Sequence, residues 1–346
     1  MRKPFIIAAV IAVVIGGLLL VLFNVPAAQD KLFVRLVSAI GNSPASQPDG
    51  LRVVVCGSAS PLGNDPTRAQ ACIAVLTPDH FYVFDAGAGS ASRIGQARLP
   101  TGRLNGVLLT HFHSDHIADL PGINLVRWVN GAKNSLNVYG PEGVEEVISG
   151  FNAAYALDRG YRITHHGEEL LPRHVGPMTP VAFRSGTVVS DGDLTIQVFS
   201  VDHSPIHPAV GYRVDYKGRS VVISGDTIAV DTLFTAAKDA DLVFHDALSR
   251  TLLDIMIPAI RQSGQDRLAK VMTDVLDYHA DSRNIEGGLD AAGVKQLVLY
   301  HLVPVPQNAL ARTMFRRGLS PNTILAEDLM VFDLPADSQE IHVSDI

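Results

Sequence analysis

Short apolar runs that end at turn-forming residues dominate the chain after residue 50. In the first half, such runs predict strands at 51–56, 72–76, 81–84, 107–109 and 136–139. The first three are closely spaced and end at Gly, Asp or Pro turns, which is typical of an antiparallel meander. Helical spacing of apolar side chains appears at 119–130 and again from Val144 to Ile148. The segment 150–184 has weak periodicity and is interpreted as an inserted lid or arm.

The second half repeats this alternation. Apolar runs predict strands at 194–201, 211–216, 220–223, 241–244 and 294–300. Lys217-Gly218-Arg219 joins two of these runs as a hairpin turn, and a long helical region is predicted over 252–278. Because strands alternate with helices in both halves, we expect two sheets packed face to face with helices on the outer faces.

The N-terminal segment has a different composition. An uncharged run of apolar residues extends from Pro4 to Phe23 after Arg2 and Lys3. About 20 such residues can cross a bilayer as one helix, whereas a cleaved signal peptide has a shorter apolar core. We therefore predict a transmembrane anchor, with the N-terminus in the cytoplasm. The part of the chain after residue 50 then lies outside the cytoplasm, in the periplasm if the source is Gram-negative.

Cleavage remains an alternative, because Val25-Pro26-Ala27 resembles a small-residue cleavage site and a cleaved protein would be secreted. The domain boundaries follow from these features. Residues 1–28 are predicted to be the membrane anchor or signal segment, 29–50 a linker, and 51–346 the main folded domain. The linker ends in a Pro- and Ser-rich stretch.

Composition narrows the function classes. The chain has 346 residues and a formal net charge of −7, which argues against a general nucleic-acid binder because phosphate contacts need a basic face. Its two cysteines, Cys56 and Cys72, each lie in an apolar run. They could form a disulfide in an oxidising compartment or stay as buried thiols, and the sequence leaves both open.

The most informative stretch follows the strand at 107–109. Within six positions it carries His111, His113, Asp115 and His116. In an extended segment, His-X-His places both rings on one side, so His111 and His113 can hold one ion. Asp115 and His116 follow at a corner and can face a second ion.

Other predicted strands also end at ligand-type residues. These are His203, Asp226, His245 and His301. Because strands of one sheet end along one edge, we expect these side chains to converge. His207 competes with His203, but His203 directly follows its strand. Surface positions are expected for His165, His166 and His174 in the weakly periodic segment.

The order of these motifs resembles the metallo-β-lactamase superfamily. The resemblance covers essentially residues 51–346 and rests on His111-X-His113-X-Asp115-His116, Ser224-Gly-Asp226-Thr and Tyr300-His301. The Phe244-His245-Asp246-Ala run and the opening Cys56-Gly-Ser-Ala-Ser-Pro61 look most like its ribonuclease Z and arylsulfatase branch. The resemblance implies an αββα four-layer sandwich of two mixed sheets with helices outside.

It also implies a two-zinc hydrolase. His111, His113 and His203 would hold one Zn²⁺, Asp115, His116 and His301 a second, and Asp226 would bridge them. Two such ions activate a water as hydroxide for attack on a phosphodiester or similar ester. Asp115 would orient or deprotonate that water, and His279 would assist the leaving oxygen. His245 would have either a catalytic or a structural role, with Asp226 or His279 as its neighbours. Mn²⁺ or Fe²⁺ could replace zinc.

Two departures bear on the substrate. Asp246 stands where ribonuclease Z usually has glutamate, and Ala280-Asp281 where a small hydroxyl residue usually follows the histidine. The segment between Pro141 and Ser185 contains four arginines and six acidic residues, whereas an arm that binds RNA should be basic. We therefore expect a small ester in preference to nucleic acid. Arylsulfatase or lactonase activity, and a non-catalytic metal-binding protein, are the alternatives. A homodimer is compatible with the sequence.

Overall fold

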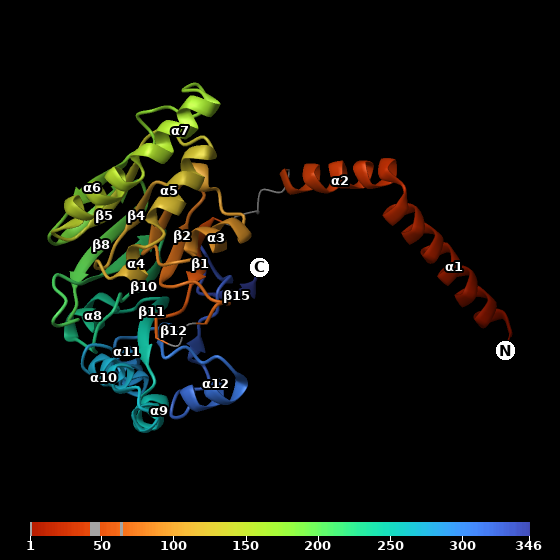
Figure 1. The fold of residues 1–346 in the computed structure, drawn as a ribbon. Coiled ribbons are helices and arrows are strands. Elements are labelled where there is room, and N and C mark those ends of the chain that lie inside the picture. Colours follow the sequence, from red (N-terminus) through yellow and green to blue (C-terminus); the bar gives the residue numbers. More distant parts are fainter. Residues whose placement is uncertain (1, 42–48, 63–64) are drawn as a thin grey trace. The chain divides into compact units, whose positions relative to one another are not determined.

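The computed structural model describes residues 2–41, 49–62 and 65–346. Contacts divide the chain into two compact units, Met1–Ser46 and Gln47–Ile346. The first contains α1 (Arg2–Asn24) and α2 (Pro26–Gly41), labelled in Figure 1. Helix α2 thus occupies the first part of the predicted linker, and residues 42–48 of that linker lie outside the described residues.

The single spanning helix predicted at 4–23 is not found. Among the described residues, no one helix combines the length and hydrophobicity needed to cross a bilayer; Val14–Asn24 and Pro26–Ser38, bent by 90°, meet that requirement only as a pair. The break falls before Pro26, which is favoured at the first position of a new helix because it has no backbone N–H.

The first sheet of the second unit is eight-stranded over the described residues. Its order is β15-β14-β1-β2-β3-β4-β5-β6. The bounds are β1 Gly50–Gly57, β2 Cys72–Leu76, β3 Phe81–Phe84, β4 Gly106–Leu108, β5 Leu136–Gly140, β6 Met178–Ala182, β14 Met330–Pro335 and β15 His342–Asp345. The predicted antiparallel meander is β1-β2-β3, and β3 to β6 pair in parallel.

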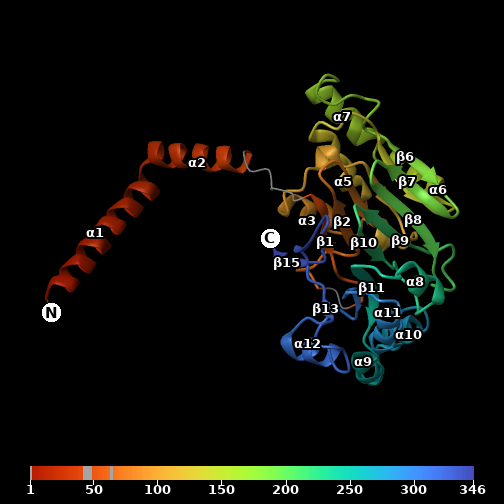
Figure 2. The ribbon, with the colours of Figure 1, turned by 180° about the vertical axis from the view of Figure 1, so that it is seen from behind.

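The second sheet is seven-stranded over the same described part, with the order β13-β12-β11-β10-β9-β8-β7. The bounds are β7 Gly186–Asp191, β8 Leu194–Ser200, β9 Val210–Tyr216, β10 Arg219–Ile223, β11 Leu242–Leu248, β12 Gln296–Val303 and β13 Ile324–Leu325. Strands β7 to β10 are antiparallel, whereas β10 to β13 pair in parallel. Figure 2 shows β7, β8 and β9 from behind.

Helices cover the outer face of each sheet. Their bounds are α3 Ser90–Gln96, α4 Ser114–Ile117, α5 Leu120–Val129, α6 Val144–Ala154, α7 Ala156–His166, α8 Asp231–Ala236, α9 Arg250–Gln262, α10 Asp266–Asp274, α11 Glu286–Ala291 and α12 Ala309–Phe315. Short 3₁₀ turns are η1 Thr101–Arg103, η2 Val275–Asp277 and η3 Ser282–Asn284. In Figure 1, α5 and α6 lie beside the first sheet, and α8 and α11 beside the second.

Three buried clusters account for the layering. The central one lies between the sheets and joins side chains of both, such as Val53 and Phe84 with Tyr212 and Phe244. A second packs the first sheet against α3, α5 and α6, and a third packs the other sheet against α8, α11 and α12. Burial of apolar surface on both faces explains why the strands read as nearly continuous apolar runs. The prediction of two mixed sheets with helices is confirmed.

Three local predictions were wrong. The weakly periodic segment 150–184 is not only a lid or arm, because it contains α7 and ends in β6, which extends the first sheet. The long helix predicted at 252–278 is two helices, since Ser263-Gly264-Gln265 interrupts it and Gly264 has a φ of 80°. Strand β11 continues through His245 to Leu248, so His245 lies inside the strand and not after it.

The two cysteines are joined. Cys56 and Cys72 form a disulfide across β1 and β2. Both are fully buried. The structure therefore adopts the disulfide alternative of the two that the sequence left open.

Candidate metal centre

The histidine-rich loop begins where β4 ends. Thr110 is held by Asp85, whose carboxylate accepts hydrogen bonds from the Thr110 N–H (2.8 Å) and hydroxyl (2.9 Å). The chain is extended up to His113, which precedes α4 with a ψ of 149°. Helix α4 then turns Asp115 and His116 back toward the loop. An extended segment followed by one helical turn thus directs four ligand-type side chains into one space.

The second sheet supplies the other side chains. Asp226 follows β10 after Gly225, whose φ is 64°, and a Cβ there would lie 2.8 Å from the Thr110 side chain. Only glycine allows this close approach of the two sheets. His301 occupies a bulge in β12, where the pairing with β11 shifts register, and its own φ is 43°. Bulges commonly re-aim a side chain in this way.

The first group of ligand-type side chains lies around Asp226. His111, His113, His203 and Asp226 each offer a ligand atom within 4.8 Å of the others. The Nε2 atoms of His111 and His203 both lie 3.8 Å from Asp226 Oδ2. His111 Nε2 also lies 3.0 Å from His113 Nδ1. These four residues come from three separate parts of the chain.

A second group shares the same carboxylate. It consists of Asp115, His116, Asp226 and His301. His116 Nε2 lies 3.2 Å from Asp226 Oδ2, and His301 Nδ1 lies 3.5 Å from Asp226 Oδ1. His301 Nε2 donates to Asp115 Oδ2 at 3.0 Å. Asp226 is therefore common to both groups, and all seven residues predicted as ligands meet there.

The Nδ1 atoms of three of these histidines contact residues outside the two groups. His116 Nδ1 donates to Asp85 Oδ2 at 2.8 Å, and His203 Nδ1 donates to the Tyr278 carbonyl at 2.9 Å. His111 Nδ1 lies 3.0 Å from the Thr110 hydroxyl. Such contacts fix the ring orientation of metal-binding histidines and leave the other nitrogen free for the ion.

Four buried ligand-type atoms make no hydrogen bond within the described residues: His116 Nε2, His203 Nε2, Asp226 Oδ1 and His301 Nδ1. Leaving buried polar atoms unpaired costs roughly 1–3 kcal/mol each. Bound divalent cations would satisfy all four atoms, so the residues present fit a two-ion site. Neutral imidazole and carboxylate are ligands that zinc accepts.

Burial and neighbouring charges set the protonation of the site. Burial, together with the His116 charge, holds the pKa of His111 well below its usual value. Burial disfavours charge on His116, but Asp226, Asp85 and Asp115 raise its pKa well above the usual value. Burial likewise opposes ionisation of Asp115, and His116 and His301 outweigh it, so the pKa of Asp115 is well below its usual range. A cation at His116 would displace its proton.

His279 lies beside this centre, supported by a residue whose role sequence reasoning missed. Asp246 Oδ2 accepts a hydrogen bond from His279 Nδ1 at 2.8 Å. Asp246 is fully buried and follows His245 in β11. Its position next to a predicted site histidine was the available signal, because a buried carboxylate needs a partner.

His245 does not reach the cavity. Its ring is fully buried, with Nδ1 lying 2.7 Å from the Asp246 carbonyl and 3.1 Å from Asp246 Oδ1. The His245 side chain therefore contacts Asp246 from the buried interior, away from the cavity. Of its expected neighbours Asp226 and His279, neither has an interaction with His245 among those described, and Asp246 links it indirectly to His279.

The other histidines lie apart from the centre. His207 is exposed and joins neither ligand group, whereas His203 is buried within the first. His165 and His166 end α7, and His174 follows it; all three are exposed. The preference for His203 over His207 thus agrees with the positions of the two side chains.

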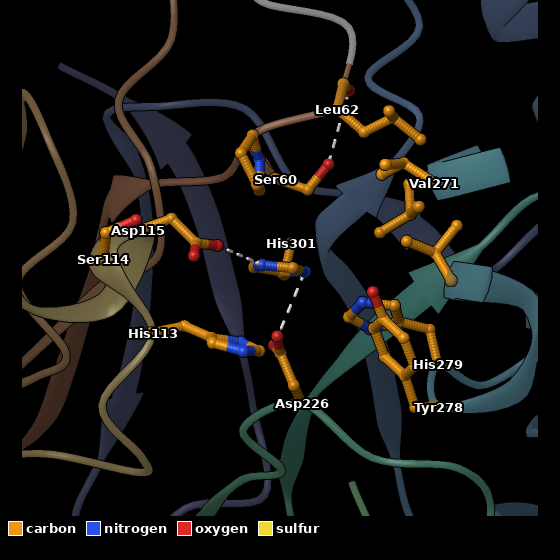
Figure 3. A pocket seen from close by; sticks show the side chains of 13 residues that line it. Ser60, Leu62, His113, Ser114, Asp115, Asp226, Val271, Tyr278, His279 and His301 are labelled. Carbon is orange, nitrogen blue, oxygen red and sulfur yellow. Dashed lines mark hydrogen bonds and ion pairs between the residues drawn. The ribbon is translucent and has the colours of Figure 1, made fainter. Parts of the chain in front are cut away.

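A cavity of about 310 Å³ opens onto the centre. Figure 3 shows His113, Ser114 and Asp115 on one side of it and Val271, Tyr278 and His279 on the other, with Asp226 and His301 between them. Sequence reasoning missed Val271 of α10, Val275 of η2 and the Ser60–Leu62 segment, which also line the cavity. No motif marks them, because such residues are common in any packed helix or loop.

Comparisons with known proteins agree with this geometry. A family model described as "Beta-lactamase superfamily domain" matches residues 80–302. Ribonuclease Z of Mycobacterium bovis (strain BCG / Pasteur 1173P2) is 33% identical over 73% of this chain and 86% of its own length. Ribonuclease Z of Mycolicibacterium gilvum (strain PYR-GCK) is 31% identical over 78% and 92%.

Solved structures share the fold. The metallo-beta-lactamase fold protein YhfI from Bacillus subtilis superposes with a TM-score of 0.60 at 20% identity, covering 82% of this chain and all of that one. The short form of human tRNase Z gives a TM-score of 0.59 at 21% identity, covering 82% and 99%. The superfamily resemblance predicted from the histidine motif is confirmed. The chain belongs to the metallo-β-lactamase superfamily and, within it, is related to ribonuclease Z.

Proposed function

We propose that this protein is a hydrolase that uses two divalent metal ions to cleave a phosphodiester or a similar ester. One observation carries the proposal: two groups of His and Asp side chains, all buried except the partly exposed His113, share Asp226, which lines an open cavity. The ribonuclease Z relatives support phosphodiester chemistry, because a ribonuclease cleaves phosphodiester bonds.

We assign His111, His113 and His203 to one ion, Asp115, His116 and His301 to the other, and Asp226 to both. Zinc suits this set of imidazole and carboxylate ligands, and Mn²⁺ or Fe²⁺ would also be accepted. When bound, two such ions lower the pKa of a water and stabilise the charge that develops on the attacked centre.

The protein's own residues then orient the reactants. Asp115 lines the cavity and can accept a hydrogen bond from the attacking water. His279 also lines the cavity; its Nδ1 is bound to Asp246, which leaves Nε2 available to donate a proton to the leaving oxygen. Asp246 positions the His279 ring, and His245 supports Asp246 from the buried side.

We further propose that the first unit attaches the enzyme to a membrane, with the hydrolase outside the cytoplasm. The apolar run at 4–23 and the bent helix pair Val14–Asn24 and Pro26–Ser38 support attachment. The Cys56–Cys72 disulfide supports an oxidising compartment. In that location the enzyme would meet small esters more readily than tRNA. Membrane fractionation with protease protection tests this, and a soluble cytoplasmic protein would contradict it.

The activity test compares three substrates with the purified full-length chain. We expect turnover of bis(p-nitrophenyl) phosphate, with about two metal ions per chain by elemental analysis and loss of activity on chelation. Turnover of p-nitrophenyl sulfate alone would indicate an arylsulfatase instead. Cleavage of precursor tRNA with little action on small esters would overturn the preference for a small substrate. An unchanged rate in His116→Ala would refute the proposed site.

A further inference from the structure

The cavity above the candidate metal centre has two chemically different sides. One is formed by His113 from the loop after β4 and by Ser114 and Asp115 at the start of α4. In Figure 3, Val271, Tyr278 and His279 lie on the other side. The apolar lining residues of the cavity are Pro61, Leu62, Val271, Val275 and Val303, together with the ring of Tyr278.

The apolar side is the one that holds His279. Val271 lies in α10, Val275 is the first residue of η2, and Tyr278 directly precedes His279. The Tyr278 ring packs against the His279 ring, with centroids 4.9 Å apart. In the proposed reaction His279 donates to the leaving oxygen, so the group attached to that oxygen must lie beside these apolar side chains.

Part of this surface is exposed within the part of the chain that the structure describes. Val271 is 51% exposed, whereas Ala269 and Met272 on the same helix are buried against the core. Helix α10 therefore uses one face for packing and offers Val271 to the cavity. Apolar surface lining a ligand cavity is normally covered when the ligand binds.

The cavity also lacks the side chains that grip a nucleic-acid chain. Among the described residues, none of those lining it is Lys or Arg. Binding of single-stranded nucleic acid needs a basic groove along the backbone, in addition to stacking surfaces. A volume of about 310 Å³ suits a small ester, being near the lower end of typical ligand pockets.

We infer that the leaving group of the substrate is an apolar alcohol, aryl or branched alkyl, seated against Val271, Val275 and Tyr278. This inference rests on the proposed function. In the step, the water oxygen bonds to phosphorus and the bond from phosphorus to the alcohol oxygen breaks. The alcohol oxygen takes a proton from His279, and the proton lost by the water restores that imidazole through solvent.

The test uses two methyl phosphodiesters whose leaving groups are 4-ethylphenol and 4-(2-hydroxyethyl)phenol. The two phenols have similar acidity, so a difference in kcat/KM reports on apolar contact. We expect the full-length, metal-loaded enzyme to prefer the ethylphenyl ester by about tenfold, the lower end of what a methylene-sized change in an apolar pocket gives. Val271→Asn should reduce this ratio severalfold.

Ile255→Asn on α9 is the matched control, because Ile255 is 56% exposed and does not line the cavity. Its ratio should equal that of the unmodified enzyme. Equal kcat/KM for both esters, or an unchanged ratio in Val271→Asn, would overturn the inference while leaving the phosphodiesterase proposal intact. Higher kcat/KM for precursor tRNA than for the ethylphenyl ester would also overturn it. Failure to cleave any diester would instead contradict the proposed function.

Discussion

Four of the seven candidate ligands lie within six consecutive residues after β4, whereas the other three come from separate points of the second sheet. The first set is oriented by one loop and a single helical turn, α4. The second set depends on the alignment of distant strands; His301, for example, meets Asp115 across a sequence separation of 186 residues. One half of the centre is therefore a local structure, and the other half exists only when the two sheets are packed together.

Removal of Asp226 should have the largest effect, because this carboxylate belongs to both halves. We expect Asp226→Ala to lose both ions and to lower kcat/KM by well over 100-fold, since even residues that only support a metal ligand are worth roughly 10–100-fold. Elemental analysis and bis(p-nitrophenyl) phosphate hydrolysis measure this. Asp231→Ala, at an exposed aspartate of α8 outside both groups, is the control. Two ions per chain in Asp226→Ala would disprove the shared role.

The packing of the second sheet should also be weakened by a change at the beginnings of its strands, the end opposite the candidate ligands. Asp241 accepts hydrogen bonds from Arg219 Nε (3.0 Å), Ser220 N (2.8 Å) and Lys295 Nζ (2.7 Å), so it joins the beginnings of β10, β11 and β12. Asp241→Ala would leave the buried Arg219 charge uncompensated. We expect a loss of about 3–5 kcal/mol in the free energy of unfolding, measured with urea. Asp254→Ala, which breaks an exposed pair with Arg250, should change it by less than about 1 kcal/mol.

The same contact predicts a pH dependence. Burial opposes ionisation of Asp241, but the hydrogen bonds from Arg219 and Lys295 outweigh it and lower its pKa below 3.8. A carboxyl with a lowered folded-state pKa stabilises the protein above its unfolded pKa and loses that contribution as pH falls. The stability gap between the unmodified protein and Asp241→Ala should thus be complete near neutral pH and shrink below about pH 4. A gap that stayed constant down to pH 2 would exclude this origin.

The same contrast explains what the sequence could and could not predict. The loop ligands and the strand-end residues Asp226 and His301 follow from residue type and position, because strand ends share a sheet edge. Asp246 and the apolar wall around Val271 were missed, since their roles come from packing between elements far apart in the chain. Strand β6 was missed because this edge strand contains Pro180 and carries no clear alternation.

A substitution at Asp85 tests whether the loop ligands depend on the hydrogen bonds that this carboxylate accepts. The carboxylate binds His116 Nδ1 and both donors of Thr110, and its φ of 58° is one that asparagine also tolerates. Asp85→Asn therefore keeps the backbone but replaces a charged acceptor with an amide. We expect metal affinity to fall by about 10–100-fold. Competition with a chelator measures it, and an affinity equal to that of the unmodified protein would show that the loop orients His116 unaided.

The smallest effect should come from His207, which lies four residues after His203 but is exposed and outside both ligand groups. His203→Ala removes a buried candidate ligand from the half that long-range packing assembles, so the metal content should fall by about one ion per chain. His207→Ala removes an equal side chain from the same connection without touching the centre, and metal content and kcat/KM should stay within about twofold of the unmodified protein. If His207→Ala lost an ion and His203→Ala did not, the connection between β8 and β9 would have to present the other histidine, and the strand-end rule would fail at this position.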